Sequence, residues 1–283
     1  MEPTVERALT WFEALGYTVL LRSDIVSGRH QTVLQSYHNG LLGDRFRQAM
    51  QRINPTVSPR QIESVFRQLT VSRPIPMLQQ NRQRHLQLLN GIRIESSESR
   101  PLLQLIDFSN LHNNDWLVIR SFPVIEADHQ HCLDLVVFVN GLPLAVFQGL
   151  HLGDEAWSLR AAYLQLQKYK AHLPQFFAWN ELLVLSNGGQ SRIGTLSSER
   201  FARIQSAHGE EAPLTGETEI ETFIQGVFDQ RRFSEILQHF IVFRQNRTKL
   251  TKKLRSHSFC TVTYPQSMSR RIDLERAMRR NAN

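Results

Sequence analysis

The chain has 283 residues, of which 41% are hydrophobic, and this is enough to bury the core of a full α/β domain with additions. Its formal net charge of +7 favours an acidic partner, with nucleic acid first and an acidic protein or membrane surface second, and a merely solvated basic surface is the alternative. With only Cys132 and Cys260 and no apolar run near 18 residues, the composition excludes a disulfide-stapled secreted domain and a membrane-spanning protein, and it predicts a cytoplasmic one.

The first part of the chain is predicted to be mostly helical. Apolar residues at helical spacing predict a helix over residues 4–16, and residues 17–21 follow as a short strand. Residues 35–72 predict two helices that are separated at Asn54-Pro55. Ser58 with a following proline is expected to cap the second of them.

The next part mixes a helix with predicted strands. A helix around residues 79–87 ends before residues 91–95, which are expected to enter the sheet. Residues 102–108 and 116–122 predict two more strands, joined by an asparagine-rich loop. Asp107, near the end of the first of them, can be taken for a metal ligand, but a cap of the following turn is the favoured interpretation.

Residues 133–150 carry the strongest local signal in the chain. Two short apolar runs flank Asn140-Gly141, and an Asn-Gly pair between such runs predicts a tight antiparallel hairpin. Asp134 opens the first strand and Gln148 closes the second, so both belong to the same edge of the hairpin. That edge is where we expect a functional site.

Beyond the hairpin the pattern returns to helices around one more strand. Residues 155–172 predict a helix, residues 182–186 predict a strand, and two amphipathic segments follow between residues 220 and 243. The composition shifts after this point. We therefore divide the chain into a globular domain, residues 1–243, and a basic helical tail or linker stub, residues 244–283.

The tail is rich in lysine and arginine, and its acidic residues are only Asp273 and Glu275. Such a run suits contacts with the phosphates of a nucleic acid, and it also suits an ordinary solvated tail. The candidate DNA-binding side chains are Lys249, Lys252, Lys253, Arg255, Arg270 and Arg271. The sequence has no GxxxxGK[ST] motif, so ATP-driven translocation by this chain is not expected.

Several of these motifs occur in the same order in one known family. The Asn140-Gly141 turn continues as Leu-Pro-Leu, and residues 174–196 follow the family pattern P.lF.yN...v.sdG..ar.Gtl. The chain thus resembles the N-terminal nuclease region of the R (restriction) subunit of type I restriction-modification enzymes, a branch of the PD-(D/E)xK nucleases. The resemblance covers roughly residues 1–245 and implies an α/β restriction-endonuclease-like core, with a mixed central sheet flanked by helices and with helical additions.

The resemblance also implies a site that has lost part of its chemistry. The family has an acidic residue and a Glu-x-Lys motif where this chain has Asp134, Gln148 and Leu150. A glutamine oxygen is a neutral and weaker metal ligand, and leucine can neither bind the attacking water nor stabilise charge. We therefore expect a weakened or silent site, with Asp134 as its metal ligand and with Mg²⁺ as the cofactor only if the site is active.

Other side chains of the family site are retained or offer substitutes. Gln165 and Tyr169 match a Gln-x-x-x-Tyr motif on one helical face, which argues against complete decay. Lys168 is the candidate for a lysine that has moved to the helix, and Glu6 matches a glutamate that faces the metal in the family. For both, a solvated helix charge is the alternative. Glu155 is a weaker candidate for a second carboxylate.

Two histidines lie beside a cysteine just before the hairpin site. His129, His131 and Cys132 are residue types that bind zinc. Without a second pair of ligands at a suitable spacing, the sequence does not favour a metal site here.

Three functions from different classes remain open. The preferred one is a nuclease-fold protein that binds DNA or a partner without cutting. The second is a Mg²⁺-dependent endonuclease with a rearranged site built from Asp134, Gln148 and Lys168. The third is a protein-interaction module of a restriction or phage-defence complex, with restriction-modification subunits or other proteins as partners and no membrane partner.

Overall fold

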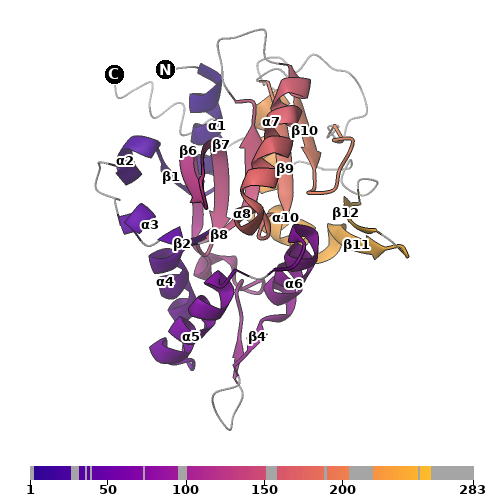
Figure 1. Cartoon of the computed structure of the whole chain (residues 1–283). Coiled ribbons are helices and arrows are strands. Elements are labelled where there is room, and N and C mark those ends of the chain that lie inside the picture. The colour runs from indigo at the N-terminus through magenta and orange to yellow at the C-terminus, as the bar shows by residue number, and fades with distance from the viewer. Residues whose placement is uncertain are drawn as a thin grey trace, which may run out of the picture.

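The structure is a computed structural model built around one mixed sheet (Figure 1). It describes residues 3–26, 32–35, 37–38, 40–72, 74–94, 101–150, 158–187, 190–203, 219–247 and 249–255. The central sheet has six strands in the order β1-β6-β7-β8-β9-β10. These strands are β1 Thr18–Leu20, β6 Trp116–Glu126, β7 His129–Val139, β8 Leu142–Gln148, β9 Leu182–Ser186 and β10 Ser191–Gly194.

This sheet contains both parallel and antiparallel pairs of strands. β6, β7 and β8 are antiparallel neighbours, whereas β1 pairs in parallel with β6 and β9 pairs in parallel with β8. β10 returns antiparallel to β9. The predicted mixed sheet is therefore confirmed.

Both faces of the sheet are buried, which explains the nearly unbroken apolar runs of the hairpin. Along β7, Leu135 and Val137 belong to one hydrophobic cluster, and Val136 and Phe138 belong to another on the opposite face. Successive side chains of a strand point to opposite faces, so a strand covered on both sides must be apolar at every position.

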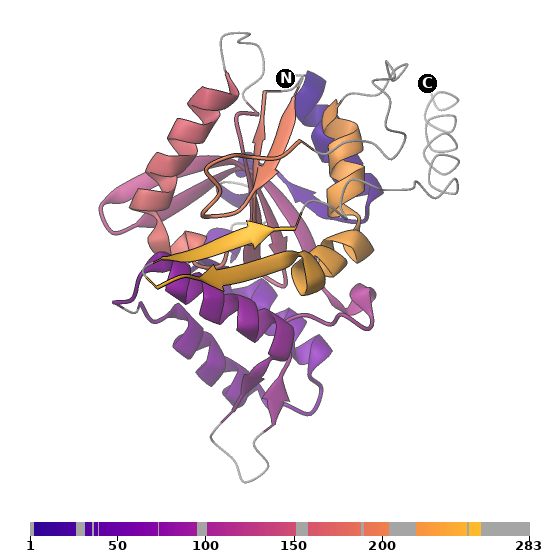
Figure 2. The same cartoon turned by 90° about the vertical axis from the view of Figure 1, so that its right-hand side faces the viewer.

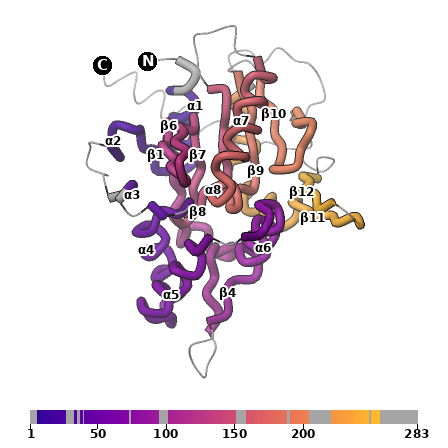
Figure 3. The backbone as a smooth tube through the Cα atoms, in the orientation of Figure 1, coloured from indigo at the N-terminus to yellow at the C-terminus, as the bar shows by residue number. Residues whose placement is uncertain are grey.

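Helices cover the two faces. The structure has α1 Pro3–Ala14, α2 Arg22–Val26, α3 Thr32–Gln35, α4 Gly43–Ile53, α5 Pro59–Thr70, α6 Met77–Asn90, α7 Leu159–His172, α8 Pro174–Phe177, α9 Glu219–Phe228 and α10 Gln230–Glu235, with a 3₁₀ helix η1 Leu111–Asn113 and a π-helix η2 Ile236–Phe240. Buried residues of α1, α4, α9 and α10 belong to the cluster on one face, and those of α2, α7 and α8 belong to the cluster on the other. The backbone tube in Figure 3 shows α4, α5 and α6 gathered at one end of the sheet. No helix within the described ranges is long and apolar enough to cross a membrane.

The predicted Asn-Gly turn is confirmed and is buried. Asn140 and Gly141 both have positive φ, 54° and 77°, as a tight hairpin turn requires. The Asn140 amide group donates to Leu105 O and to Asn114 Oδ1, at 2.8 Å each. A Cβ on Gly141 would lie 2.7 Å from the carbonyl oxygen of Leu42, so only glycine fits where the turn meets the start of α4.

Local sequence signals predicted several other elements correctly. The structure contains the predicted helices as α1, α4, α5, α6 and α7, and the predicted strand over residues 182–186 as β9. Ser58 caps α5 in a capping box with Gln61. Asp107 is a turn cap, since its carboxylate accepts backbone N–H groups from Ser109 and Asn110 at 2.9 Å each.

Two predictions about strands and the tail were wrong. β4 Ile92–Arg93 and β5 Leu102–Leu103 pair only with each other and do not join the central sheet. The segment predicted as the start of a helical tail contains β11 Ile241–Gln245 and β12 Leu250–Leu254, an antiparallel hairpin that packs against α6 (Figure 2). Residue 243, where we placed the domain boundary, therefore lies inside a strand. Residues 256–283 lie outside the described residues.

Candidate active site beside helix α7

Asp134 closes the open edge of the β7–β8 hairpin. Its side chain is 7% exposed, and its Oδ2 atom accepts the backbone N–H groups of Gly149 at 2.7 Å and Leu150 at 3.0 Å. These are the first two residues after β8. The carboxylate thus holds the chain where it leaves the sheet, and one of its two oxygens is engaged by charge-assisted hydrogen bonds.

Gln148 is the last residue of β8 and faces α7. Its side chain is completely buried, and its amide nitrogen donates to Gln165 Oε1 at 3.3 Å. Its own Oε1 atom is buried without a hydrogen-bond partner among the described residues. A buried amide oxygen in this state costs free energy.

Gln165 and Tyr169 extend this contact along α7, as predicted for two positions four residues apart. The Gln165 amide nitrogen donates to the Tyr169 hydroxyl. Burial raises the pKa of Tyr169; the Gln165 hydrogen bond acts to lower it, and the charge of Asp134 adds to the rise. The structure therefore brings Asp134, Gln148, Gln165 and Tyr169 into one polar cluster, which we call the Gln148 cluster.

Leu150 lies away from this cluster. Gly149 has a φ of +93°, and a Cβ there would lie 2.4 Å from Ser186 O and 2.8 Å from the Ala162 Cβ. The chain passes between β9 and α7 at this glycine and turns, so Leu150 packs with 3% exposure into the hydrophobic cluster that also contains Phe12 and Phe147. The position where the resemblance places a lysine thus points into apolar core, and not toward Gln148.

The other candidate side chains are not part of the Gln148 cluster. Lys168 is exposed on α7. The pKa values of His131 and His172 are lowered first by desolvation, and the charges of neighbouring histidines and of the Lys168 ammonium add to this. Among the described residues, no hydrogen bond or ion pair joins the Glu6 side chain to Asp134 or Gln148. Glu155 lies outside the described residues.

The oxygen atoms of the Gln148 cluster fit Mg²⁺ poorly. Asp134 is its one carboxylate, and one oxygen of that carboxylate already accepts two N–H groups. The Gln148 amide oxygen is neutral. Mg²⁺ demands near-ideal octahedral geometry and is usually bound through one or two carboxylates together with waters and substrate phosphates, so a single carboxylate that is already engaged with the backbone would hold it weakly.

A group of histidines lies beside the Gln148 cluster. His131 Nε2 is 2.8 Å from His172 Nδ1, the rings of His129 and His172 stack at 3.9 Å, and the ring of His131 lies 4.6 Å from that of Tyr169. The pKa of His131 is lowered by its burial and by the charges of His172, Lys168 and His129. His172 was missed from the sequence because nothing local indicates that the end of α7 meets the start of β7.

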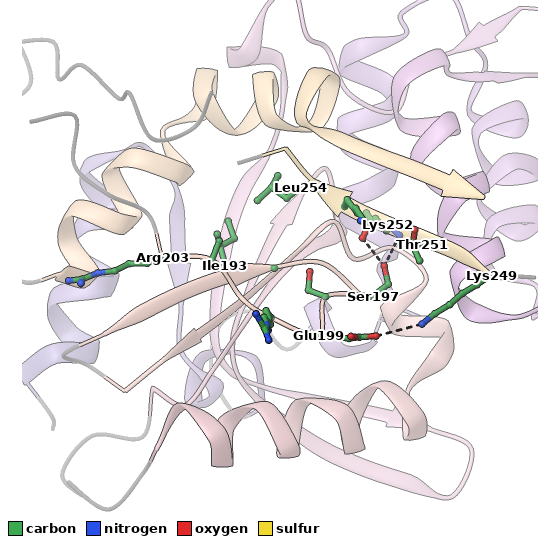
Figure 4. Close-up of a pocket in the computed structure, with 13 residues that line it drawn as sticks. Ile193, Ser197, Glu199, Arg203, Lys249, Thr251, Lys252 and Leu254 are labelled. Carbon is green, nitrogen blue, oxygen red and sulfur yellow. Dashed lines mark hydrogen bonds and ion pairs between the residues drawn. The ribbon is translucent and has the colours of Figure 1, made fainter. Parts of the chain in front are cut away.

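The predicted DNA-binding residues are divided by the structure. Lys249, Lys253 and Arg255 are exposed, whereas Arg270 and Arg271 lie outside the described residues. Lys249 and Lys253 line a cavity of about 600 Å³ between β10, the segment that follows it, and β12. Figure 4 shows Lys249 directed at Glu199 across this cavity, and their charged atoms are 3.6 Å apart.

Lys252 is buried and does not belong to the basic surface, which corrects its assignment as a phosphate contact. Its side chain is fully buried, and its ammonium contacts Glu181 Oε2 at 2.5 Å, Asn81 Oδ1 at 2.9 Å and Asn180 O at 2.9 Å. His85 Nδ1 also lies 3.1 Å from Glu181 Oε2. We call these residues the Glu181 cluster. Burial lowers the pKa of Lys252, and Glu181 offsets this only in part.

The fold and the Gln148 cluster together define a mixed α/β domain with a polar site buried between its central hairpin and one helix. Residues 2–200 match the sequence model of the family described as "Type I restriction enzyme R protein N terminus". The chain therefore belongs to this family, as its motifs predicted.

Two curated proteins are similar to this chain. One is the "Type I restriction enzyme HindI endonuclease subunit" of Haemophilus influenzae, 24% identical over 224 residues, which are 76% of this chain and 21% of that protein. The other is the "Putative type I restriction enzyme MjaIXP endonuclease subunit" of Methanocaldococcus jannaschii, 24% identical over 260 residues, 83% of this chain and 25% of that protein. The chain thus spans between a fifth and a quarter of the length of these relatives.

Proposed function

We propose that this chain is a PD-(D/E)xK-type nuclease domain that binds DNA without cutting it, and that it acts in the cytoplasm within a type I restriction or related phage-defence assembly. The observation that carries the proposal is the state of the Gln148 cluster. Its only carboxylate is engaged with the backbone, its second metal position is an amide, and the lysine position is a leucine in the core.

The missing groups are the ones that phosphodiester hydrolysis needs most. The reaction requires anionic oxygens that hold a metal ion, and a cation that stabilises developing charge on the phosphate. Each such group commonly contributes several powers of ten to the rate. Lys168 is the candidate replacement on α7, but its side chain is exposed and its charge acts on His131.

The surface around the cavity of Figure 4 supports the DNA-binding part of the proposal. Four exposed basic residues line this cavity, namely Arg200, Arg203, Lys249 and Lys253. Of the described residues that line it, Glu199 is the one acidic residue. Cations on one face attract a polyanion by release of its counterions, whatever the base sequence. The subunit partners are proposed from the relatives, whose names describe them as subunits of restriction enzymes.

The test incubates the purified chain with supercoiled and linear DNA, in Mg²⁺ or Mn²⁺ and in EDTA, and reads cleavage and gel shift together. We expect a shift whose affinity falls steeply with salt, and no cleavage. Replacing both Lys249 and Lys253 by alanine should weaken the shift and reduce the slope of log affinity against log salt by about 1 per lost phosphate contact.

The matched control removes two positive charges from another part of the surface. Arg60→Ala with Arg67→Ala on α5 should leave the shift nearly unchanged. Metal-dependent cleavage that disappears in Asp134→Ala would overturn the proposal in favour of a rearranged endonuclease that uses Asp134, Gln148 and Lys168. Absence of any salt-sensitive shift would point to a protein-interaction module.

A further inference from the structure

Three histidines from two elements meet at one point of the surface. His129 and His131 are two residues apart on β7 and therefore share a face of the strand, and His172 is the last residue of α7. One ring nitrogen of each lies within 4.8 Å of the corresponding nitrogens of the other two. His172 is 41 positions from His131 in sequence, so only the packing of α7 on the sheet brings it to the other two.

The spacing of the nitrogens is close to that of a metal site. Four-coordinate zinc with Zn–N bonds of about 2.0–2.1 Å places its ligand atoms about 3.3 Å apart. The distance between His131 Nε2 and His172 Nδ1, 2.8 Å, is shorter than this ligand–ligand distance. The upper limit for the distances among all three nitrogens, 4.8 Å, is longer than it. On binding, the His131–His172 hydrogen bond would be replaced by bonds to the ion, and the stacked rings of His129 and His172 would turn so that their nitrogens converge on it.

We propose that His129, His131 and His172 form a binding site for a divalent transition-metal ion of the zinc class. Neutral imidazole nitrogens suit zinc, nickel, cobalt and copper, whereas Mg²⁺ prefers oxygen. His129 is exposed and the other two are half-buried, so an ion can enter from solvent. Three protein ligands leave at least one coordination position open for water or for an anionic oxygen.

The surroundings fix which residues take part. Cys132 is excluded as a ligand, because its sulfur is 3.7 Å from Arg22 Nη1 and neighbouring strand residues point to opposite faces. The Lys168 ammonium acts on His131 and His172 and opposes a bound cation. The negative charge of the Glu126 carboxylate interacts with His129 and favours a bound cation. This carboxylate also accepts hydrogen bonds from the backbone N–H groups of Gln175 and Phe176.

A bound ion would join two elements beside the Gln148 cluster. It would tie the start of β7 to the end of α7, and His131 contacts Tyr169, the last member of that cluster. An ion that binds only the folded chain stabilises it by mass action. The site does not use Asp134, so it stands apart from the Mg²⁺ position that the family resemblance implies.

The test uses the chain without a polyhistidine tag, stripped of metal with EDTA and dialysed. Zn²⁺ affinity is measured by competition with a chromogenic chelator, Co²⁺ binding by its visible absorption bands, and thermal unfolding with and without Zn²⁺. We expect one ion per chain, a cobalt spectrum that indicates nitrogen ligands, and a higher melting temperature with Zn²⁺. Millimolar Mg²⁺ should not compete.

The ligand assignment is tested by single substitutions. His129→Ala, His131→Gln and His172→Ala should each weaken Zn²⁺ binding by at least about 10- to 100-fold, since loss of even an outer partner of a metal ligand has effects of that size. His129 is the most exposed of the three, so its substitution keeps the test valid if another variant fails to fold. His112→Ala, at an exposed histidine on η1, and Asp134→Ala should retain binding. The proposal would be overturned if Zn²⁺ did not bind the parent chain, or if the three ligand variants bound Zn²⁺ as tightly as the parent chain. The histidines would then be a hydrogen-bonded pair only.

Discussion

The Gln148 cluster and the Glu181 cluster are both buried polar groups, and they differ in the side chains that accompany the buried polar atoms. In the Gln148 cluster, the strand ends on a neutral amide whose oxygen has no partner among the described residues. In the Glu181 cluster, a fully buried carboxylate and a fully buried ammonium are in direct contact. The chain therefore has a charged pair in its interior, at a distance from the positions where the family chemistry expects charges.

The difference shows what keeps a charge inside a protein. A buried charge needs an opposite charge and further hydrogen bonds, because desolvation otherwise outweighs every gain. Lys252 has Glu181, Asn81 and the carbonyl of Asn180 around it. Near position 148, the residue at the family's lysine position is Leu150, which lies in the apolar core. A neutral side chain is the less costly occupant there.

The largest expected effect breaks the Glu181 cluster. Lys252→Met removes the ammonium and leaves the Glu181 carboxylate buried beside His85 alone, which should lower the free energy of unfolding by about 3–5 kcal/mol. Urea unfolding followed by circular dichroism measures this loss. Lys253→Met, at the exposed neighbouring position, is the matched control and should change stability by less than about 0.5 kcal/mol. Equal stability of the two variants would show that the buried pair contributes nothing.

The second effect tests where position 150 points. Leu150→Lys brings an ammonium into an apolar cluster with no carboxylate partner, and we expect a loss of about 2–4 kcal/mol. Leu150→Met keeps the volume and the apolar surface, so it should cost less than about 1.5 kcal/mol. If the lysine variant is as stable as the methionine variant and gains metal-dependent cleavage together with Gln148→Glu, position 150 reaches the site after all.

A third variant tests the turn that separates Leu150 from Gln148. Gly149→Ala adds a Cβ at positive φ and within 2.4 Å of a carbonyl oxygen, and should cost about 1–3 kcal/mol or more. Gly226→Ala in α9 is the control, since nothing lies within 4 Å of its added Cβ. It should stabilise the chain by about 0.5–1 kcal/mol. The two thermal unfolding curves should therefore move in opposite directions.

The smallest effect depends on pH. Gln148→Glu puts a carboxyl group into a buried position beside Asp134, and both burial and the like charge should raise its pKa in the folded state. The unfolded chain ionises this group near pH about 4.3, so the folded state loses stability as pH rises above that value, by about 1–2 kcal/mol at pH 7.

Unfolding by urea at pH 4 and pH 7 measures this change, with Gln51→Glu on the exposed face of α4 as the control. If Mg²⁺ restores the lost stability at pH 7, the variant has regained a metal site. We expect no such rescue.

Much of the fold was readable from local sequence signals. The Asn140-Gly141 turn, the Ser58 capping box and the strand over β9 depend on a few adjacent residues whose conformational preferences agree with the final fold. Gln165 and Tyr169 were also placed correctly on one helical face, because their spacing alone decides it.

Burial and long-range contact were not readable in this way. The charge pattern after residue 243 predicted a basic helical tail or linker stub with Lys252 as a phosphate contact. Instead, β11 and β12 form a hairpin and Lys252 is buried. Its ionic partner Glu181 lies 71 positions away in sequence, where no local pattern indicates the contact. The same limit hid the histidine group, in which His172 is 41 positions from its partner His131.

The sequence by itself determined the family, the central hairpin and the identity of the changed residues, since these follow from residue types and short spacings. Only the tertiary structure decided that Asp134 binds the backbone at the end of β8, that Leu150 turns into the core, and that three histidines meet beside Tyr169. The physical reason is that the charge and contacts of a side chain depend on neighbours from distant elements, which only the packed chain brings within reach.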